Sequence, residues 1–298
     1  MDPVYLAKLL PPPDAPEAEL RAGVLAATLY TATFIPLPYD AEFDAPAAGK
    51  GLAAGGGGAA SAPGRTADLH TIYNLSELVS RMTSPDLTDP SFMMAIASAK
   101  NTGKTRFVRE LIGRLRTIGL IQYVTVISAI PESSMRDYGN PIGHGGELVD
   151  KFYEYQPLIA QRVYDAQRQI FDSGTETPRH LVVFDDVAGT TINHDSGLTS
   201  IATRGRQFNL SSIVSSQLPN TVLTPTFKSM ADYTLFGMLD TDGQKIISKG
   251  LNYQPLMSPK EFSEWLRKNV GGAIGSPNRF VFGLYDKLNQ QLLKIRAE

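Results

Sequence analysis

The sequence predicts an α/β fold in which helices cover both faces of a mainly parallel β-sheet. Short apolar runs typical of buried strands alternate along the chain with segments of amphipathic helical spacing, the order that parallel sheets require. The chain has 298 residues, of which 42% are hydrophobic and 19% charged, enough for a sizeable core. It contains no cysteine, which excludes disulfides and thiolate metal sites. No apolar run of about 18 residues is present, so no membrane span is expected.

The first 67 residues are expected to form a flexible N-terminal arm and linker. Residues 1–44 are rich in proline, with one short helix predicted at Leu20–Thr31. Ala45–Arg65 consists largely of Gly and Ala, which bury too little surface to order a chain. The folded domain is therefore predicted over residues 68–298. The start of the chain lacks the basic flank and long apolar stretch of a signal peptide, which favours an intracellular protein.

From residue 92 onward the pattern predicts alternating strands and helices. The first pair is a strand at Phe92–Ala97 and a helix at Gly103–Ile118, whose apolar residues share one face. Another helix is predicted to begin after Ser258, an N-cap residue followed by proline and, three positions on, by glutamate. The other predicted strands are Gln122–Ile130, His180–Asp186, Ser211–Gln217, Tyr233–Gly237 and a final strand at Phe280–Tyr285, and the other predicted helices are Gly146–Phe171 and Ser196–Gln207.

The C-terminal part of the domain, from about residue 243, is basic and is a candidate appended subregion. Residues 243–298 hold 9 Lys and Arg against 4 Asp and Glu, whereas residues 1–100 hold 6 against 11. A basic region is typical of a nucleic-acid contact, but charge this dilute is more common on a solvated helical surface. Charge alone leaves both interpretations open.

The segment between the first strand and the first helix fits the phosphate-loop pattern G-x-x-x-x-G-K-S/T, except that Ser98 replaces the first glycine. Backbone N–H groups and a helix N-terminus would meet there and stabilise phosphate charge. Lys104 is expected to reach the β- and γ-phosphates of ATP, and Thr105 to ligate Mg²⁺. A helix can begin with Gly-Lys-Thr by chance, but the flanking strand and helix favour the nucleotide site. The candidate nucleotide-binding residues are Ser98, Ala99, Lys100, Asn101, Thr102, Gly103, Lys104 and Thr105.

Polar residues at the ends of two later strands complete the candidate site. The strand "LVVFDD" ends in Asp185 and Asp186, about 80 residues after the loop. We expect Asp185 to hold Mg²⁺ and Asp186 to position or deprotonate the attacking water. Gln217, at the end of the next predicted strand, is a candidate sensor of the γ-phosphate, although turns also favour such residues.

Two arginines, Arg204 and Arg206, lie in the segment "TRGRQFN" before that strand. A guanidinium group that reaches a neighbouring subunit's γ-phosphate stabilises the charge of the transition state. Arginines at a helix C-terminus also suit the helix dipole without any catalytic role. The sequence leaves these two interpretations equally open.

The ordered set of motifs resembles the genome-packaging ATPases of large double-stranded DNA viruses, within the FtsK–HerA superfamily of P-loop motors. The resemblance rests on the Gly-Lys-Thr loop, "VVFDD", "RGRQFNLSSIVSSQ" and "LPNTV", and it covers roughly Phe92–Asp240. The sequence departs from the family pattern at Ser98, at Gln207, where relatives often have His, and in the Ala/Gly-rich N-terminal region.

This resemblance implies a RecA-like core that assembles into a homo-oligomeric ring, a pentamer or hexamer. Such a motor hydrolyses ATP with Mg²⁺ and drives double-stranded DNA into a preformed capsid, with capsid vertex proteins among its partners. The implied location is the host cytoplasm or viral factory, or the virion. Two alternatives stay open: another DNA-pumping ATPase of the superfamily, for plasmid or chromosome transfer, and a nucleotide-binding interaction protein that has lost hydrolysis.

Overall fold

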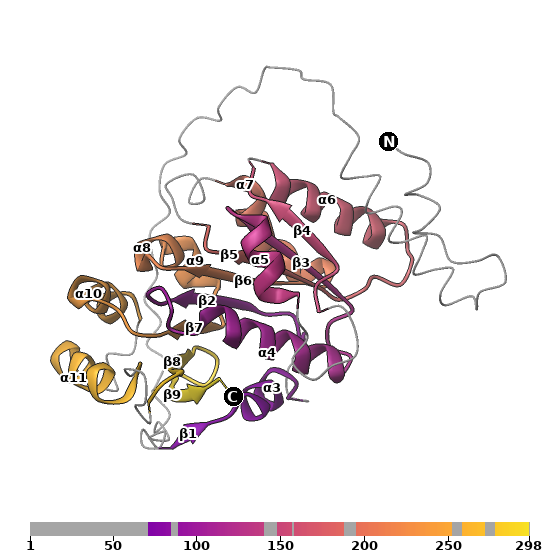
Figure 1. Cartoon of the computed structure of the whole chain (residues 1–298). Coiled ribbons are helices and arrows are strands. Elements are labelled where there is room, and N and C mark those ends of the chain that lie inside the picture. Colours follow the sequence, from indigo (N-terminus) through magenta and orange to yellow (C-terminus); the bar gives the residue numbers. More distant parts are fainter. Residues whose placement is uncertain are drawn as a thin grey trace, which may run out of the picture. The chain divides into compact units, whose positions relative to one another are not determined.

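A single nine-stranded sheet organises the part of the chain that the computed structural model describes, namely residues 71–84, 89–139, 148–156, 158–187, 195–251, 258–271 and 278–297 (Figure 1). The arm predicted over residues 1–67 and its helix lie outside these residues. The sheet order is β1-β9-β8-β7-β2-β6-β5-β3-β4. Its strands are β1 Ile72–Tyr73, β2 Met93–Ala97, β3 Tyr123–Ser128, β4 Lys151–Glu154, β5 His180–Asp185, β6 Leu210–Ser216, β7 Tyr233–Phe236, β8 Val281–Asp286 and β9 Gln291–Arg296.

The sheet is mainly parallel, as predicted. Six of its eight neighbouring pairs are parallel, and the two antiparallel pairs are β7–β8 and β8–β9. β6 lies between β2 and β5, so the carboxyl ends of these three strands meet at one edge of the sheet. In open α/β sheets, ligands bind in the crevice outside this edge. The candidate site residues from these strand ends are therefore brought together by topology alone.

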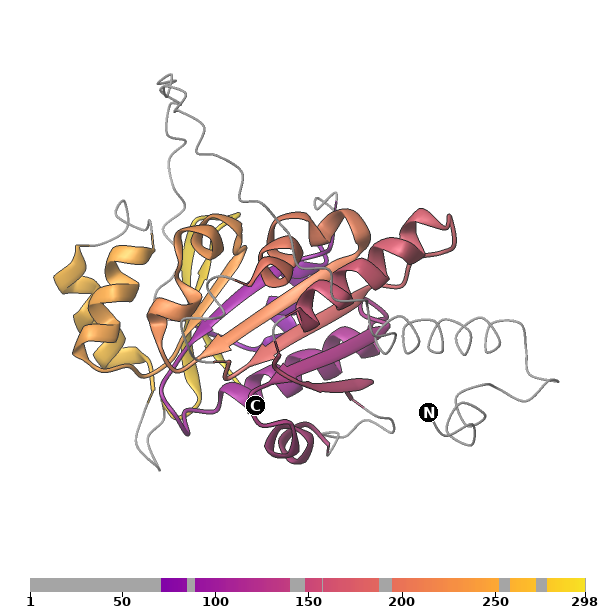
Figure 2. The same ribbon diagram turned by 90° about the horizontal axis from the view of Figure 1, so that it is seen from above.

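Helices cover both faces of the sheet (Figure 2). The strands supply both cores by strict alternation: Leu181 and Val183 of β5 face one core, and Val182 and Phe184 face the other. One face is covered by α3 Leu75–Met82, α4 Lys104–Thr117 and α5 Pro131–Tyr138. The other is covered by α6 Ile159–Asp172, α7 Ser196–Arg204, α8 Pro219–Val222, α9 Pro225–Met230, α10 Thr241–Gly250 and α11 Pro259–Asn269.

Local sequence signals explain several of the helix ends. The predicted helix start at Ser258 is confirmed as the N-cap of α11, with a reciprocal capping box to Glu261. α7 ends at Arg204 and continues as one 3₁₀ turn, η2 Gly205–Phe208, so the predicted helix Ser196–Gln207 is confirmed with a tighter last turn. No helix in the described ranges is long and apolar enough to cross a membrane.

Two sequence predictions are wrong. The segment Gly146–Phe171 was expected to be one helix, but its described residues form strand β4 and then helix α6. β4 pairs in parallel with β3. In addition, the proline at position 157 disfavours a helical conformation of the residue before it, which interrupts a helix there. The strand predicted as the last, Phe280–Tyr285, is β8, and β9 follows it in an antiparallel hairpin. Apolar residues alternate too weakly in "QLLKIR" for the sequence alone to reveal that strand.

His180, at the start of β5, should make the fold sensitive to acid. Burial lowers the pKa of its ring to about 4, and Nε2 lies 2.9 Å from Oγ1 of Thr125. Between pH 6.5 and 4 the unfolded chain binds a proton here that the folded chain does not, so stability falls as the pH falls. Denaturant unfolding should show the free-energy difference between wild type and His180→Gln shrinking by roughly 2 kcal/mol from pH 7 to pH 5. A difference that is independent of pH would contradict the neutral buried ring.

Candidate active site

The loop from Ser98 to Gly103 joins the carboxyl end of β2 to the first turn of α4. Two backbone hydrogen bonds tie its start to the sheet: Ser98 N–H donates to the carbonyl of Ser216 at 3.2 Å, and Ala99 N–H to that of Met238 at 2.9 Å. Gly103 has φ 97°, a left-handed conformation that glycine adopts without strain. Lys104 folds back over the loop, and its Nζ donates to the carbonyl of Ser98 at 2.7 Å.

Ser98 fits the place of the missing glycine because the neighbouring strand provides room. Its side chain is fully buried, and its Oγ lies 2.6 Å from Oγ1 of Thr102, across the loop. Thr102 Oγ1 in turn donates to the carbonyl of Ala99 at 2.8 Å. Gly237, just after β7, faces Ser98 so closely that a Cβ there would lie 1.9 Å from Ser98 Oγ. The hydroxyl therefore braces the loop in space that a glycine on the adjacent strand leaves open.

This contact makes Gly237→Ala a strongly destabilising change. The added methyl group would overlap Ser98 Oγ and Cβ, and overpacking of this kind costs about 1–3 kcal/mol. Chemical denaturation should show that loss, and the double variant Ser98→Gly/Gly237→Ala should recover part of it. Equal losses in the single and double variants would mean that the clash lies elsewhere.

Asp185 is the last residue of β5 and shares a sheet face with Leu181 and Val183. That face is covered by α4 and α5, so the carboxylate lies among Lys104, Tyr138 and Ser215. Burial raises the pKa of Asp185 to about 6, Asp186 adds to the rise, and the ammonium of Lys104 opposes it. The hydroxyl groups of Tyr138 and Ser215 also lower it. A carboxyl held this way carries its negative charge only because cationic and polar partners surround it.

Asp186 turns away from the strand with φ 51°, in the left-handed region that Asp tolerates better than most residues. Gln217, one residue beyond β6, donates from Nε2 to Oδ2 of Asp186 at 2.7 Å. The other carboxylate oxygen, Oδ1, is buried and has no hydrogen-bond partner among the described residues. The structure thus joins the ends of β5 and β6 by one amide–carboxylate bond and leaves one buried acceptor unused.

Lys104 is close enough to both carboxylates to interact with them electrostatically. Burial lowers the pKa of its ammonium group, while Asp186 and Asp185 raise it. Lys104 is 8% exposed and Asp185 6%, so little solvent reaches either residue. At this depth the ammonium group is stabilised by the Ser98 carbonyl that it contacts and by the nearby carboxylates rather than by solvent. The predicted loop lysine, the Asp pair and Gln217 are therefore brought together in one place.

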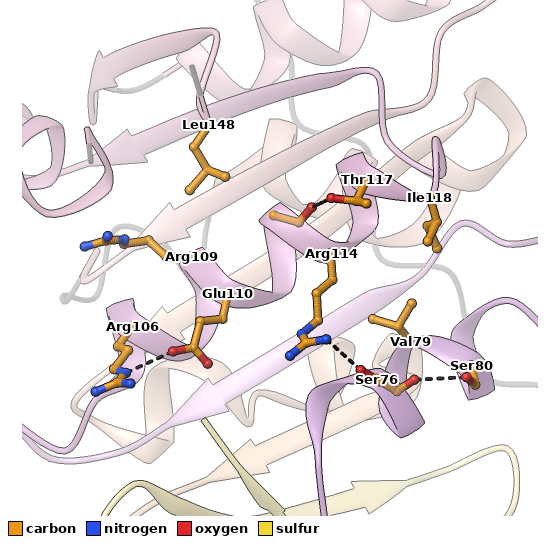
Figure 3. Close-up of a pocket in the computed structure, with 11 residues that line it drawn as sticks. Ser76, Val79, Ser80, Arg106, Arg109, Glu110, Arg114, Thr117, Ile118 and Leu148 are labelled. Carbon is orange, nitrogen blue, oxygen red and sulfur yellow. Dashed lines mark hydrogen bonds and ion pairs between the residues drawn. The ribbon is translucent and has the colours of Figure 1, made fainter. Parts of the chain in front are cut away.

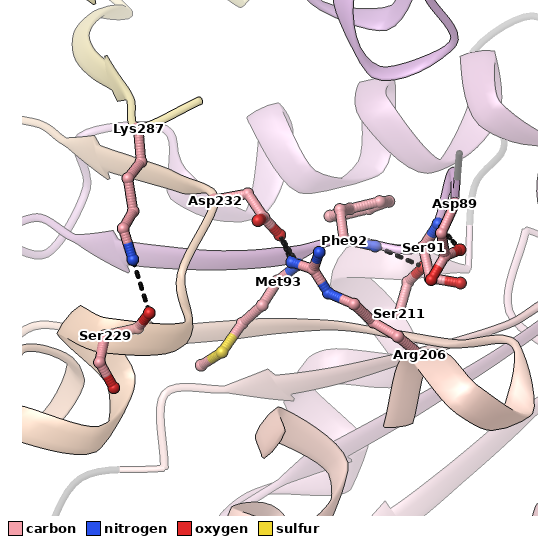
Figure 4. Close-up of polar contacts among 9 residues, drawn as sticks. All are labelled: Asp89, Ser91, Phe92, Met93, Arg206, Ser211, Ser229, Asp232 and Lys287. Carbon is pink, nitrogen blue, oxygen red and sulfur yellow. Dashed lines mark hydrogen bonds and ion pairs between the residues drawn. The ribbon is translucent and has the colours of Figure 1, made fainter. Parts of the chain in front are cut away.

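Arg204 and Arg206 lie at the opposite edge of the sheet from this cluster. Arg206, in η2, forms an ion pair with Asp232, whose Oδ2 also accepts from the backbone N–H of Met93 at 2.8 Å (Figure 4). Met93 begins β2 and Asp232 immediately precedes β7, so both mark the amino ends of parallel strands. Arg204 Nη2 donates to Ser200 Oγ at 3.2 Å, and its guanidinium lies over the ring of Tyr164. Neither arginine can serve the phosphate loop of its own chain.

A pocket of about 590 Å³ lies on the outer surface of α4, between that helix and α3 (Figure 3). Arg106, Arg109 and Arg114 of α4 line it together with Glu110, and Arg114 donates to Ser76 Oγ of α3 at 2.6 Å. None of the sequence-predicted site residues is among those that line this pocket. It is therefore separate from the cluster at the strand ends.

Sequence reasoning missed Tyr138, Ser215, Gly237 and Phe280, which contact the predicted site residues. The loop glycine, Gly103, packs so closely under the Phe280 ring that a Cβ would lie 2.6 Å from Cδ1. A glycine that ends a predicted strand, as Gly237 does, signals a close backbone approach. Tyr138 and Phe280 carry no such signal, because they come from elements far away in the sequence, and Ser215 lies inside the predicted strand Ser211–Gln217 with nothing to distinguish it from the other serines there.

Comparison with known proteins gives likenesses of structure at low identity. No family model and no curated protein matches the sequence. The genome packaging NTPase B204 from Sulfolobus turreted icosahedral virus 2, in complex with AMPPCP, is 13% identical, with TM-score 0.46, over 69% of this chain and 97% of that one. VirB4 of Thermoanaerobacter pseudethanolicus is 13% identical, with TM-score 0.45, over 71% and 90%. The pCW3 conjugation coupling protein TcpA, with ATPγS, is 14% identical, with TM-score 0.44, over 68% and 59%.

Proposed function

We propose that the chain binds ATP with Mg²⁺ at the Ser98–Thr105 loop and hydrolyses it. The observation that carries this proposal is the convergence of Lys104, the adjacent Asp185 and Asp186, and Gln217, from three separate segments, at the carboxyl edge of the sheet. A buried ammonium and two carboxylates at the N-terminus of a helix match the needs of a phosphate chain and its metal. Phosphoryl transfer depends almost entirely on such positioning and charge.

The residues present fit a magnesium ion. The buried carboxylate of Asp185 and the hydroxyl group of Thr105, in the first turn of α4, are the hard oxygen donors that Mg²⁺ prefers. No group of three or more His, Asp or Glu gathers anywhere in those residues, which suits an ion held by one or two carboxylates plus phosphate oxygens. Thr105 and Asp185 would hold it. When bound, the ion neutralises charge on the β- and γ-phosphates.

Asp186 is the residue that we assign to the attacking water. Its Oδ1 is available as an acceptor, while Gln217 fixes the carboxylate through Oδ2. In this arrangement the amide of Gln217 is a positioning group for Asp186 and a candidate sensor of the γ-phosphate. Loss of hydrolysis, the alternative raised by Ser98, has little support, because Gly237 leaves room for that side chain.

We further propose that hydrolysis drives translocation of double-stranded DNA during packaging of a viral genome. This step rests on the resemblance of the ordered motifs "VVFDD" and "RGRQFNLSSIVSSQ" to packaging ATPases. Turnover of ATP by the purified protein should rise when double-stranded DNA is added, and the rise should weaken as salt increases. If ATP turnover did not change when DNA is added, the proposed ATPase activity would stand, but the proposed DNA translocation would not. Stimulation by DNA without any transport into a capsid would favour the alternative DNA-pumping motors.

Arg204 and Arg206 are proposed to act across a subunit boundary. Both are exposed and both lie at the amino edge of the strands, away from their own loop. Mixing an Arg204→Ala or Arg206→Ala chain with a Lys104→Ala chain should restore part of the ATPase activity, because a mixed ring pairs an intact loop with an intact arginine. No recovery at any ratio would exclude a trans-acting role for the arginine tested.

A further inference from the structure

Phe280 stands beside the phosphate loop in a conformation that its side chain does not favour. Its φ is 62°, an outlier for a bulky residue. Such strain persists only where the surroundings impose it, and it gathers at ligand clamps. The backbone carbonyl of Phe280 accepts from Ala297 N–H at 3.1 Å, just after β9, which anchors the residue to the sheet. Its ring covers Gly103, immediately before the loop lysine.

Two guanidinium groups lie over this half-buried ring. The Arg106 group is 5.0 Å from the ring centroid, and the Arg279 group is 4.7 Å from it. Arg106 belongs to the first turn of α4 and is held by Glu110, with Nε 2.9 Å from Oε1. Arg279 is exposed. The ring and the flat cations form a stacking platform at the N-terminus of α4.

We propose that this platform of Phe280, Arg106 and Arg279 binds the purine base of the nucleotide. The inference rests on the proposed function and extends it to the base. Phosphates bound at the loop leave the rest of the nucleotide to pass over the first turn of α4, where Arg106 and Phe280 lie. The exposed Arg279 guanidinium, now 4.7 Å from the ring centroid, moves off the ring, and the base takes its place on the aromatic face with the guanidinium closing over it. It gains stacking on an aromatic face and a cation–π contact, the two interactions that hold bases without reading their edges.

The first experiment measures dissociation constants of Mg·ATP and of Mg·tripolyphosphate, which lacks a base and a ribose. Phe280→Leu keeps apolar packing over Gly103 but removes the aromatic face, and Phe280→Tyr retains that face. Phe280→Leu should weaken ATP binding about 10- to 100-fold and leave tripolyphosphate binding unchanged. Phe280→Tyr should bind both ligands as the wild type does. A triphosphate of 2-aminopurine riboside should lose fluorescence on binding the wild type, and not on binding Phe280→Leu.

Each other outcome overturns the proposal in a distinguishable way. Unchanged ATP affinity in Phe280→Leu would place the base elsewhere and leave the ATPase proposal intact. Parallel losses of ATP and tripolyphosphate affinity would mean that Phe280 only supports the loop. A wild-type protein that binds neither ligand would overturn the proposed function, and the base platform with it.

Discussion

Replacing Lys104 with alanine should lower ATP turnover by about 100- to 1,000-fold, the loss typical of removing one group that stabilises developing charge. Lys104 is 8% exposed, and its ammonium group interacts electrostatically with Asp186 and Asp185. Solvent therefore cannot replace it where the phosphates bind. The measurement is steady-state phosphate release with saturating ATP and Mg²⁺, with and without double-stranded DNA.

The control for this prediction is Lys228→Ala, which removes an exposed lysine from α9, on the sheet face opposite to α4. It should leave turnover unchanged. Lys104→Ala also deprives the Ser98 carbonyl of a 2.7 Å hydrogen bond, so circular dichroism and a thermal melt must accompany it. Full activity in a folded Lys104→Ala protein would refute the phosphate-loop assignment.

The site was predictable where one short segment carries the whole pattern. The loop, the Asp pair and Gln217 each follow a buried strand, and parallel strands deliver their carboxyl ends to one edge. Residues that support the site from a distance were not predictable. Tyr138 belongs to α5, a helix that the sequence pattern did not indicate. Phe280 contacts Gly103 although it lies almost 180 residues later in the sequence.

The elements that were mispredicted share a physical cause. β4 is a short edge strand whose pairing with β3 overrides its local pattern, and β9 is recognisable only through the hairpin it forms with β8. Ser98 is the converse case. Taken alone, a serine in place of the first glycine weakens the match to the motif. The fold accommodates the Ser98 side chain because residue 237, nearly 140 residues later, is a glycine. Only the packing of β2 against β7 brings the two residues together.

Asp186→Asn should bind ATP almost normally and hydrolyse it about 100- to 10,000-fold more slowly, the range that general acid–base groups contribute. The change keeps the shape of the side chain, and its amide oxygen can still accept from Gln217 Nε2. What it removes is the negative charge that orients and deprotonates water. Equilibrium binding of ATP and single-turnover hydrolysis, measured on the same preparation, separate these two effects.

Asp185→Asn provides the matched comparison, because the two carboxylates are adjacent and both interact electrostatically with Lys104. If Asp185 holds Mg²⁺, its variant should need more of the ion, and excess Mg²⁺ should restore part of its turnover. The same excess should do nothing for Asp186→Asn, since a missing base is not replaced by metal. Rescue of both variants would assign both carboxylates to the ion, and an unimpaired Asp186→Asn would move the water-positioning role to another residue. The opposite responses to Mg²⁺ are what the geometry requires, because Asp185 faces Ser215 and Tyr138 whereas Asp186 is held by Gln217 with one oxygen left to accept a proton.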